Sequence, residues 1–318
     1  MRPADPSVSS AALSLLLDTL ETAVPTTRKA LAASTGLGLS TVTRAVSACV
    51  THGVLRYETS ISPDSGRPCR TICTAEGLLL PLLTLTRGHG SVRTLDMNLD
   101  PVGSTATELH PEAPPEEGAR ILSRRLLSLL GSLEDRSRVA APVLLTDREL
   151  SASLSANTIT SALGTAPLAI LSWEEAIAHT LDRASLPRST DSLLFLSVGE
   201  GERACLLLRD GEGRLTPSSL GEGLTPTLTR SLRTAPPSAE GMRRGTAVFL
   251  TDLCRFLRPR LVYVEDPRGL LGDGRFLTSL LPEGMEVLIS PTEGKLTMAQ
   301  RGAALAGRRL LWDRILQG

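Results

Sequence analysis

The chain has 318 residues, a length that favours about two domains. Apolar residues make up 41% and charged residues 21%, which is typical of a globular protein and excludes a disordered or collagen-like chain. The 34 basic and 34 acidic residues cancel, so net charge gives no argument for binding to nucleic acid or a membrane. The apolar stretches are far shorter than the ~20 residues of a membrane helix, and the first residues lack the apolar core of a signal peptide, so we expect a cytoplasmic protein.

The first 75 residues show the pattern of three helices followed by a hairpin. Apolar periodicity and capping residues predict helices at Ala11–Ala23, Thr26–Ser34 and Ser40–His52, and strands at Val54–Ile61 and Pro68–Thr74. In this pattern Ser40 caps the third helix, and Gly36 makes the tight turn before it. This order is that of a winged helix-turn-helix, which we assign to residues 1–75.

After Gly77 strands alternate with helices, which indicates an α/β body. The turn of the first hairpin of this body is predicted at Asp100-Pro-Val-Gly103. The predicted strands are Leu78–Thr86, Val92–Leu99, Val139–Leu145, Leu168–Leu171, Ser192–Val198, Ala204–Arg209, Gly213–Thr216, Leu261–Val264 and Met285–Ile289. The predicted helices are Glu116–Leu133, Asn157–Leu163, Trp173–Asp182, Thr225–Arg233, Thr246–Leu257, Gly274–Leu281 and Leu296–Leu316.

The third helix has the composition of a DNA recognition helix, which presents short polar or cationic side chains near its N-terminus and packs its other face inward. Between residues 26 and 72 six basic residues stand against two acidic ones. Arg44 can bind guanine or a phosphate, and Arg67 at the wing tip suits the minor groove. The candidate DNA contacts are Arg28, Lys29, Ser40, Thr41, Thr43, Arg44, Arg67 and Arg70. A generic helical bundle and a protein-binding winged helix remain open as alternatives.

The five cysteines are scattered and odd in number, so we expect buried thiols and no disulfide framework. Cys69 and Cys73 have metal-ligand spacing, but no second cysteine or histidine pair accompanies them. We therefore expect no metal site.

Several segments resemble the ROK family (repressors, open reading frames, kinases), and in particular its regulators. Ser65-Gly-Arg-Pro68 is similar to the family's Gly-Arg-Pro wing, Asp100-Pro-Val-Gly103 to its D-x-x-G turn, and Met298–Ala306 to its closing helix. The resemblance covers nearly the whole chain. It implies a two-lobed actin/hexokinase-like (ribonuclease H-like) body, with a first lobe at residues 76–185 that the C-terminal helix 296–318 joins, and a second lobe at residues 186–295.

The departures from the family's kinases concern their ATP and zinc sites. The segment Leu83–Gly90 lacks the aspartate and paired glycines of D-x-G-G-T, and Trp173 stands where the catalytic aspartate belongs. The second phosphate loop reads Gly199-Glu-Gly-Glu-Arg-Ala-Cys205, with two carboxylates where polyphosphate would bind. Glu265-Asp266 replaces a Gly-Gly pair that meets nucleotide, and the family's zinc motif is absent. We therefore expect no ATP, no cofactor and no phosphoryl transfer.

The sugar site implied by the resemblance is also reduced, since only Glu222 matches the family's G-E-x-G-H segment. Trp173 either fills the core or forms a stacking wall for another ligand. The candidate ligand-binding residues are Trp173, Glu174 and Glu222.

These features predict a transcriptional regulator of the repressor type. It would be a homodimer or higher homo-oligomer bound to a double-stranded DNA operator. Its body would either respond to a small effector, such as a sugar or sugar-like molecule, or serve only as a dimerisation scaffold. The alternatives are a divergent sugar kinase that binds ATP and a hexose, and a non-catalytic protein-interaction module.

Overall fold

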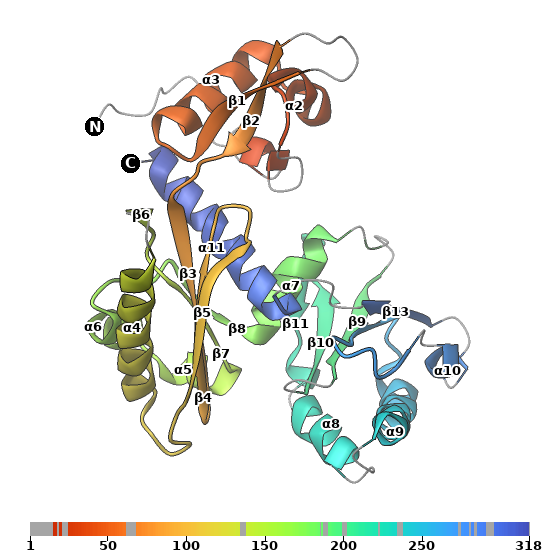
Figure 1. Ribbon diagram of the computed structural model, residues 1–318. Coiled ribbons are helices and arrows are strands. Elements are labelled where there is room, and N and C mark those ends of the chain that lie inside the picture. Colours follow the sequence, from red (N-terminus) through yellow and green to blue (C-terminus); the bar gives the residue numbers. More distant parts are fainter. Residues whose placement is uncertain are drawn as a thin grey trace. The chain divides into compact units, whose positions relative to one another are not determined.

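The computed structural model describes residues 15–17, 19–20, 25–61, 68–133, 138–184, 186, 190–198, 202–221, 223–233, 238–272, 275–279, 281–282, 285–290 and 296–317. The chain divides into two compact units, Met1–Leu171 with Ala303–Gly318, and Ser172–Gly302. This division differs from the lobe boundaries expected above, which remain a prediction. Figure 1 labels the elements of both units.

The N-terminal part of the first unit is a winged helix, as predicted. Residues 15–17 and 19–20 are helical, and they are followed by α2 (Arg28–Thr35), α3 (Leu39–Thr51) and the antiparallel hairpin of β1 (Leu55–Ile61) and β2 (Pro68–Thr74). Thr27 caps α2 by accepting the amide of Ala30, and Gly36 ends it in the left-handed conformation at φ 69°. The predicted cap of α3 is wrong, because the helix begins at Leu39 after an extended Gly38 and has no side-chain cap. Ser40 therefore lies in the first turn.

The core of the winged helix contains one residue from the far end of the chain. Trp312, on α11 (Met298–Gln317), is fully buried in this cluster. Arg138 Nη2 also donates to the Gly53 carbonyl at 3.0 Å, and Thr74 Oγ1 donates to Asn98 Oδ1 at 2.8 Å. The other buried members of the cluster are Leu16, Leu17, Leu20, Leu31, Val42, Ala45, Val46, Cys49, Val54, Leu55 and Ile72.

The first sheet contains six strands in the order β5-β4-β3-β7-β8, with β6 paired to β3 (Figure 1). The strands are β3 (Leu78–Thr86), β4 (His89–Leu95), β5 (Pro101–Glu108), β6 (Arg138–Val139), β7 (Val143–Thr146) and β8 (Ala169–Ser172). Helix α4 (Pro115–Ser132) contacts β3, β4 and β5, and α6 (Ala156–Leu163) contacts α4. Helix α5 (Arg148–Ser153) was not predicted.

Two boundaries in this sheet differ from the prediction. The β4–β5 turn comes earlier than Asp100–Gly103, because Asp96 Oδ1 accepts the amides of Asn98 and Asp100, both at 2.9 Å. The predicted strand Val139–Leu145 is split into β6 and β7. Pro142, which has no amide to donate, stands between them.

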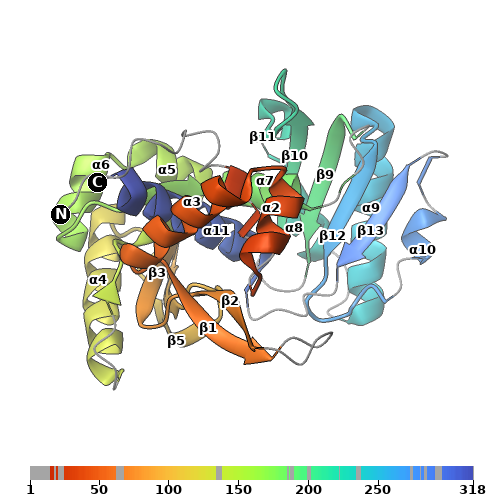
Figure 2. The same ribbon diagram turned by 90° about the horizontal axis from the view of Figure 1, so that it is seen from above.

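The second unit contains a five-stranded sheet in the order β11-β10-β9-β12-β13, whose strands lie side by side in Figure 2. Strands β9, β12 and β13 are parallel, and β10 and β11 continue the sheet antiparallel as the predicted meander. Helix α9 begins before the predicted Thr246, because Ser238 caps it by accepting the amide of Gly241. The elements are α7 (Trp173–Arg183), β9 (Ser192–Ser197), β10 (Arg203–Arg209), β11 (Leu215–Pro217), η1 (Ser219–Gly221), α8 (Leu224–Arg233), α9 (Ala239–Leu257), β12 (Leu261–Glu265), α10 (Arg275–Thr278) and β13 (Glu286–Ser290).

Four cysteines, Cys49, Cys73, Cys205 and Cys254, are free and buried, whereas the side chain of Cys69 lies outside the described residues. Within the described ranges, no three candidate metal ligands come together. No helix in the same ranges combines the length and the apolarity that crossing a bilayer requires.

Candidate functional site

Helix α3 separates its polar and apolar residues as a recognition helix does. Ser40 and Arg44 are exposed, and Thr41 and Thr43 are half-buried. The opposite face packs into the winged-helix core through the buried side chains of Val42, Ala45 and Val46. Neither α2 nor α3 contains an acidic residue. The helix therefore presents a polar, cationic surface with no carboxylate of its own.

The other candidate DNA contacts lie on α2 and the wing. Arg28 and Lys29 are the first two residues of α2, and Arg70 is an exposed residue of β2. Arg67 falls in the wing tip, residues 62–67, which lies outside the described residues.

Tyr57 on β1 joins two of these candidates, although the sequence analysis did not select it. The guanidinium carbon of Arg28 lies 5.5 Å from the centre of its ring, and that of Arg70 lies 5.9 Å from it. Both distances are in the range of a cation–π contact. The alternation of β1 already indicates which face Tyr57 occupies. Its contacts with the two arginines become visible only from the register of β1 with β2.

The opposite face of the hairpin carries an internally paired cluster. Arg56 lies 2.8 Å from a carboxylate oxygen of Glu58 and 2.8 Å from one of Glu76. The Cys73 thiol donates to Glu58 at 3.1 Å, which lowers the pKa of that carboxyl together with the hydrogen bond from Arg56. Burial, reinforced by Glu58, raises the pKa of Cys73 from 9.0 to about 11. This thiol is therefore protonated and unreactive at neutral pH.

Trp173 begins α7 with its side chain only 7% exposed, and the guanidinium carbon of Arg203 lies 5.4 Å from its ring centre. Ser172 and Glu175 form a capping box, in which the Glu175 carboxylate accepts the Ser172 amide at 2.8 Å. Glu174 is half-buried, and Glu222 lies outside the described residues. Of the candidates that the structure describes, Trp173 and Glu174 are consecutive residues of α7, and little of the indole is accessible to a ligand.

Two adjacent carboxylates, Glu265 and Asp266, are each 2% exposed at the end of β12. Glu265 Oε1 accepts the amide of Met298 at 2.7 Å. The oxygens of Asp266 accept the amides of Leu270 and Leu271 at 3.0 and 2.6 Å. Backbone amides of this kind bind anionic ligands in other proteins, but here carboxylates of the same chain bind them.

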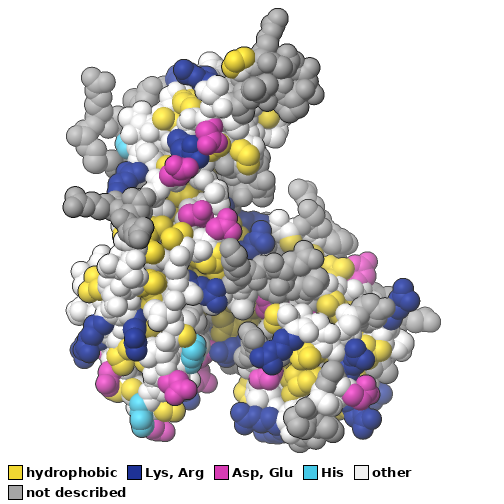
Figure 3. Space-filling model, in the orientation of Figure 1, with side chains coloured by type: hydrophobic (Ala, Val, Ile, Leu, Met, Phe, Trp, Pro, Cys, Tyr) yellow, Lys and Arg dark blue, Asp and Glu magenta, His cyan; other side chains and the backbone are white. Residues whose placement is uncertain are grey.

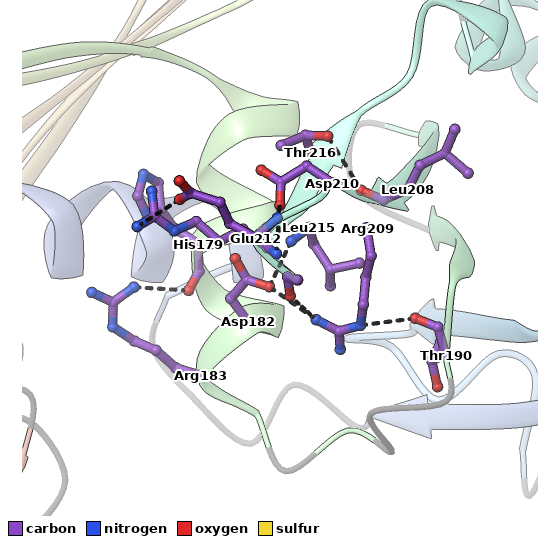
Figure 4. Close-up of polar contacts among 12 residues, drawn as sticks. His179, Asp182, Arg183, Thr190, Leu208, Arg209, Asp210, Glu212, Leu215 and Thr216 are labelled. Atoms are coloured by element: carbon purple, nitrogen blue, oxygen red, sulfur yellow. Dashed lines mark hydrogen bonds and ion pairs between the residues drawn. The ribbon is translucent and has the colours of Figure 1, made fainter.

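A polar network also ties the β10–β11 hairpin to α7 (Figure 4). Asp182 Oδ1 accepts the Leu215 amide at 2.8 Å and lies 3.6 Å from Arg209 Nη1. Arg209 also donates to the carbonyls of Thr190 and Gly213, at 2.9 and 2.6 Å. These contacts link elements of the unit to each other and have a structural role.

The second unit also contains a cavity of about 450 Å³. Arg243, Arg244 and Phe276 are among its lining residues, and the Nε of Arg243 donates to the Leu270 carbonyl at 2.9 Å. Neither Trp173 nor Glu174 lines this cavity. Over the face seen in Figure 3, basic and acidic side chains are interspersed, in keeping with their equal numbers.

Comparison with known proteins gives similarities in structure only. No family model matches the chain, and no curated protein matches it. A solved ROK family transcriptional regulator, described as a homologue of the E. coli Mlc protein, superposes with a TM-score of 0.58 at 12% identity over 96% of each chain.

Two solved sugar kinases are more distant. The polyphosphate/ATP-glucomannokinase of Arthrobacter sp. strain KM has a TM-score of 0.48 at 12% identity, over 74% of this chain and 99% of its own. The ROK glucokinase of Streptomyces griseus has a TM-score of 0.44 at 14% identity, over 71% and 98%. The chain thus shares the fold of the solved ROK family regulator over nearly its whole length.

Proposed function

We propose that this chain is a DNA-binding transcriptional regulator of the ROK family, a repressor that binds its operator as a homodimer. The body serves dimerisation and the sensing of a small effector, and it does not transfer phosphoryl groups. The observation that carries this proposal is the polar face of α3, where Ser40 and Arg44 are exposed on a helix without carboxylates. The winged-helix fold, in which such a helix enters the major groove, supports it.

The absence of phosphoryl transfer rests on the body. The carboxylates of Glu265 and Asp266 accept hydrogen bonds from backbone amides. By the resemblance, this segment corresponds to the one that contacts nucleotide in the family's kinases, so its amides are already occupied. Trp173 cannot accept a proton from a sugar hydroxyl, and its ring is nearly buried. An ATP-turnover assay with several hexoses tests this part of the proposal. Turnover above the background without protein would contradict it.

Fluorescence anisotropy of labelled duplexes over a salt series tests DNA binding. We expect DNA from upstream of the protein's own gene to bind more tightly than scrambled DNA, with a steep salt dependence. Arg44→Ala should weaken specific binding by at least about tenfold, since one base or phosphate contact is worth about 1–3 kcal/mol. Arg255→Ala, which removes an exposed arginine of α9, is the matched control and should bind as the unmodified protein does.

The results distinguish the functions that the sequence leaves open for the winged helix. No affinity for any duplex at low salt would overturn the regulator and favour a protein-binding winged helix. Equal loss of binding in Arg44→Ala and Arg255→Ala would mean that α3 is not the reading helix.

A further inference from the structure

A third extended segment runs beside the wing hairpin, ahead of α2. Thr26 forms an isolated antiparallel bridge with Ile72, in which the Thr26 amide donates to the Ile72 carbonyl at 3.1 Å and the Ile72 amide donates back at 2.6 Å. Strand β2 is therefore flanked by β1 on one side and by Thr26 on the other. Thr27 then caps α2, so Arg28 stands at the start of that helix, two residues after the bridge.

Tyr57 completes the arrangement from the other side of β2. It pairs with Ile72, so its ring stands on the same face as Ile72 and Arg70, because alternate residues of a strand share a face. The ring is half-buried and packs against the winged-helix core. Arg28 and Arg70 both lie within 6 Å of its centre, at 5.5 and 5.9 Å. Two residues far apart in sequence are thus held beside one aromatic ring.

The two cations are not balanced on this face. The carboxylates of Glu58 and Glu76 bind Arg56, which points to the other face of the hairpin. Among the described residues, no ion pair involves Arg28 or Arg70. A guanidinium that has no carboxylate partner among the described residues can bind an anion without first breaking an ion pair. The arrangement therefore favours an anionic partner.

We propose that Arg28, Tyr57 and Arg70 form a two-point clamp for the phosphate backbone of duplex DNA. Tyr57 is the positioning residue, because its ring orders both guanidiniums before DNA arrives and so reduces the entropy that binding costs. This inference rests on the proposed function and names a part of the interface that the recognition helix does not include. The clamp reads no base, so it acts equally on every DNA sequence.

The test is the salt dependence of binding to a labelled duplex of random sequence, for which no operator need be known. Arg28→Ala and Arg70→Ala should each reduce the slope of log affinity against log salt by about 1, as the loss of one phosphate contact does. Tyr57→Leu removes no charge, yet it should reduce the slope by up to about 2 and weaken binding by about tenfold. Tyr57→Phe keeps the ring and should retain the original slope.

Controls separate the clamp from folding and from the proposed function. Ser104→Leu, at an exposed position of β5 outside the winged helix, should leave the slope unchanged. If Tyr57→Leu fails to fold, as judged by circular dichroism, the slopes of the two arginine variants decide the question, and unchanged slopes overturn the clamp. An unchanged slope in a folded Tyr57→Leu overturns the role of Tyr57. If the unmodified protein has no affinity for the duplex even at low salt, the proposed function fails, and the clamp fails with it.

Discussion

The winged helix and the second compact unit use their charged side chains in opposite ways. In the second unit carboxylates bind the chain's own backbone, as Glu265 does with the Met298 amide and Asp266 with the amides of Leu270 and Leu271. In the winged helix Arg28 and Arg70 lie on the ring of Tyr57, with no ion-pair partner among the described residues. A polar group that already has its hydrogen bonds within the chain gains little from a ligand. A charged partner therefore binds more favourably at the winged helix than at these carboxylates of the second unit.

This contrast also explains why the equal counts of basic and acidic residues were uninformative. A chain with no net charge can keep a cationic surface if its carboxylates are bonded to groups in other parts of the chain. In the second unit Asp266 and Asp182 accept backbone amides. On the opposite face of the wing hairpin, Glu58 and Glu76 neutralise Arg56. The distribution of pairing, rather than net charge, distinguishes the two regions.

The largest expected effect tests whether the winged helix depends on the rest of its unit. Trp312→Ala should lower the free energy of unfolding by about 3–5 kcal/mol, because it leaves a cavity in the winged-helix core. Hydrogen exchange should show the loss of protection in α3. Trp312→Phe is the control. It should cost much less, since the indole Nε1 is buried without a hydrogen-bond partner among the described residues. Unchanged exchange in α3 of the alanine variant would mean that the winged helix is an independent domain.

A middle-sized effect tests the self-satisfied carboxylates of the second unit. Asp266→Ala should lower the free energy of unfolding by about 2–3 kcal/mol, because the Leu271 amide is left buried without its acceptor. The matched control is Asp210→Ala. Asp210 also accepts two amides, those of Glu212 and Arg214, but it is exposed, so water can replace it and the cost should stay below about 1 kcal/mol. Urea denaturation measures both, and equal costs would remove the distinction.

The last effect is absent at neutral pH, appears only in alkali, and returns to the winged helix. Burial raises the pKa of Cys49 from 9.0 to about 12, so folding favours the neutral thiol. Its contribution to stability is complete below pH 9. It is lost as the pH rises from 9 toward 12, at up to about 1 kcal/mol per pH unit, because the unfolded chain ionises first. Cys49→Ala should flatten this alkaline loss in urea denaturation between pH 9 and 11. Ser47→Ala, an exposed change on the same helix, should keep the original pH dependence.

The architecture was largely predictable because it depends on local patterns. Apolar periodicity located α2, α3 and the wing strands, and alternation of strands and helices located the body. The errors came where a single side chain or a proline decided a boundary. Asp96 moved the β4–β5 turn by accepting two amides, and Pro142 interrupted a predicted strand.

The candidate site was predictable only in part. The polar residues of α3 follow from helical spacing, and the structure shows Ser40 and Arg44 exposed, as a reading helix requires. The contacts of Tyr57 with Arg28 and Arg70 could not be foreseen, because they depend on the register of β1 with β2 and on where α2 begins. In the same way, the sequence shows the two adjacent carboxylates Glu265 and Asp266. It does not show which backbone amides they bind. Contacts between residues far apart in sequence leave no local signal.

The burial of Trp312 in the winged-helix core has a consequence for the order of events during synthesis. A nascent chain that has emerged only through β2 holds every other part of that core but lacks the indole that fills it. The ribosome must release residue 312 before the core can close. We therefore expect the winged helix to reach full stability only after the body has been made, and an incomplete chain to hold it in a less stable form.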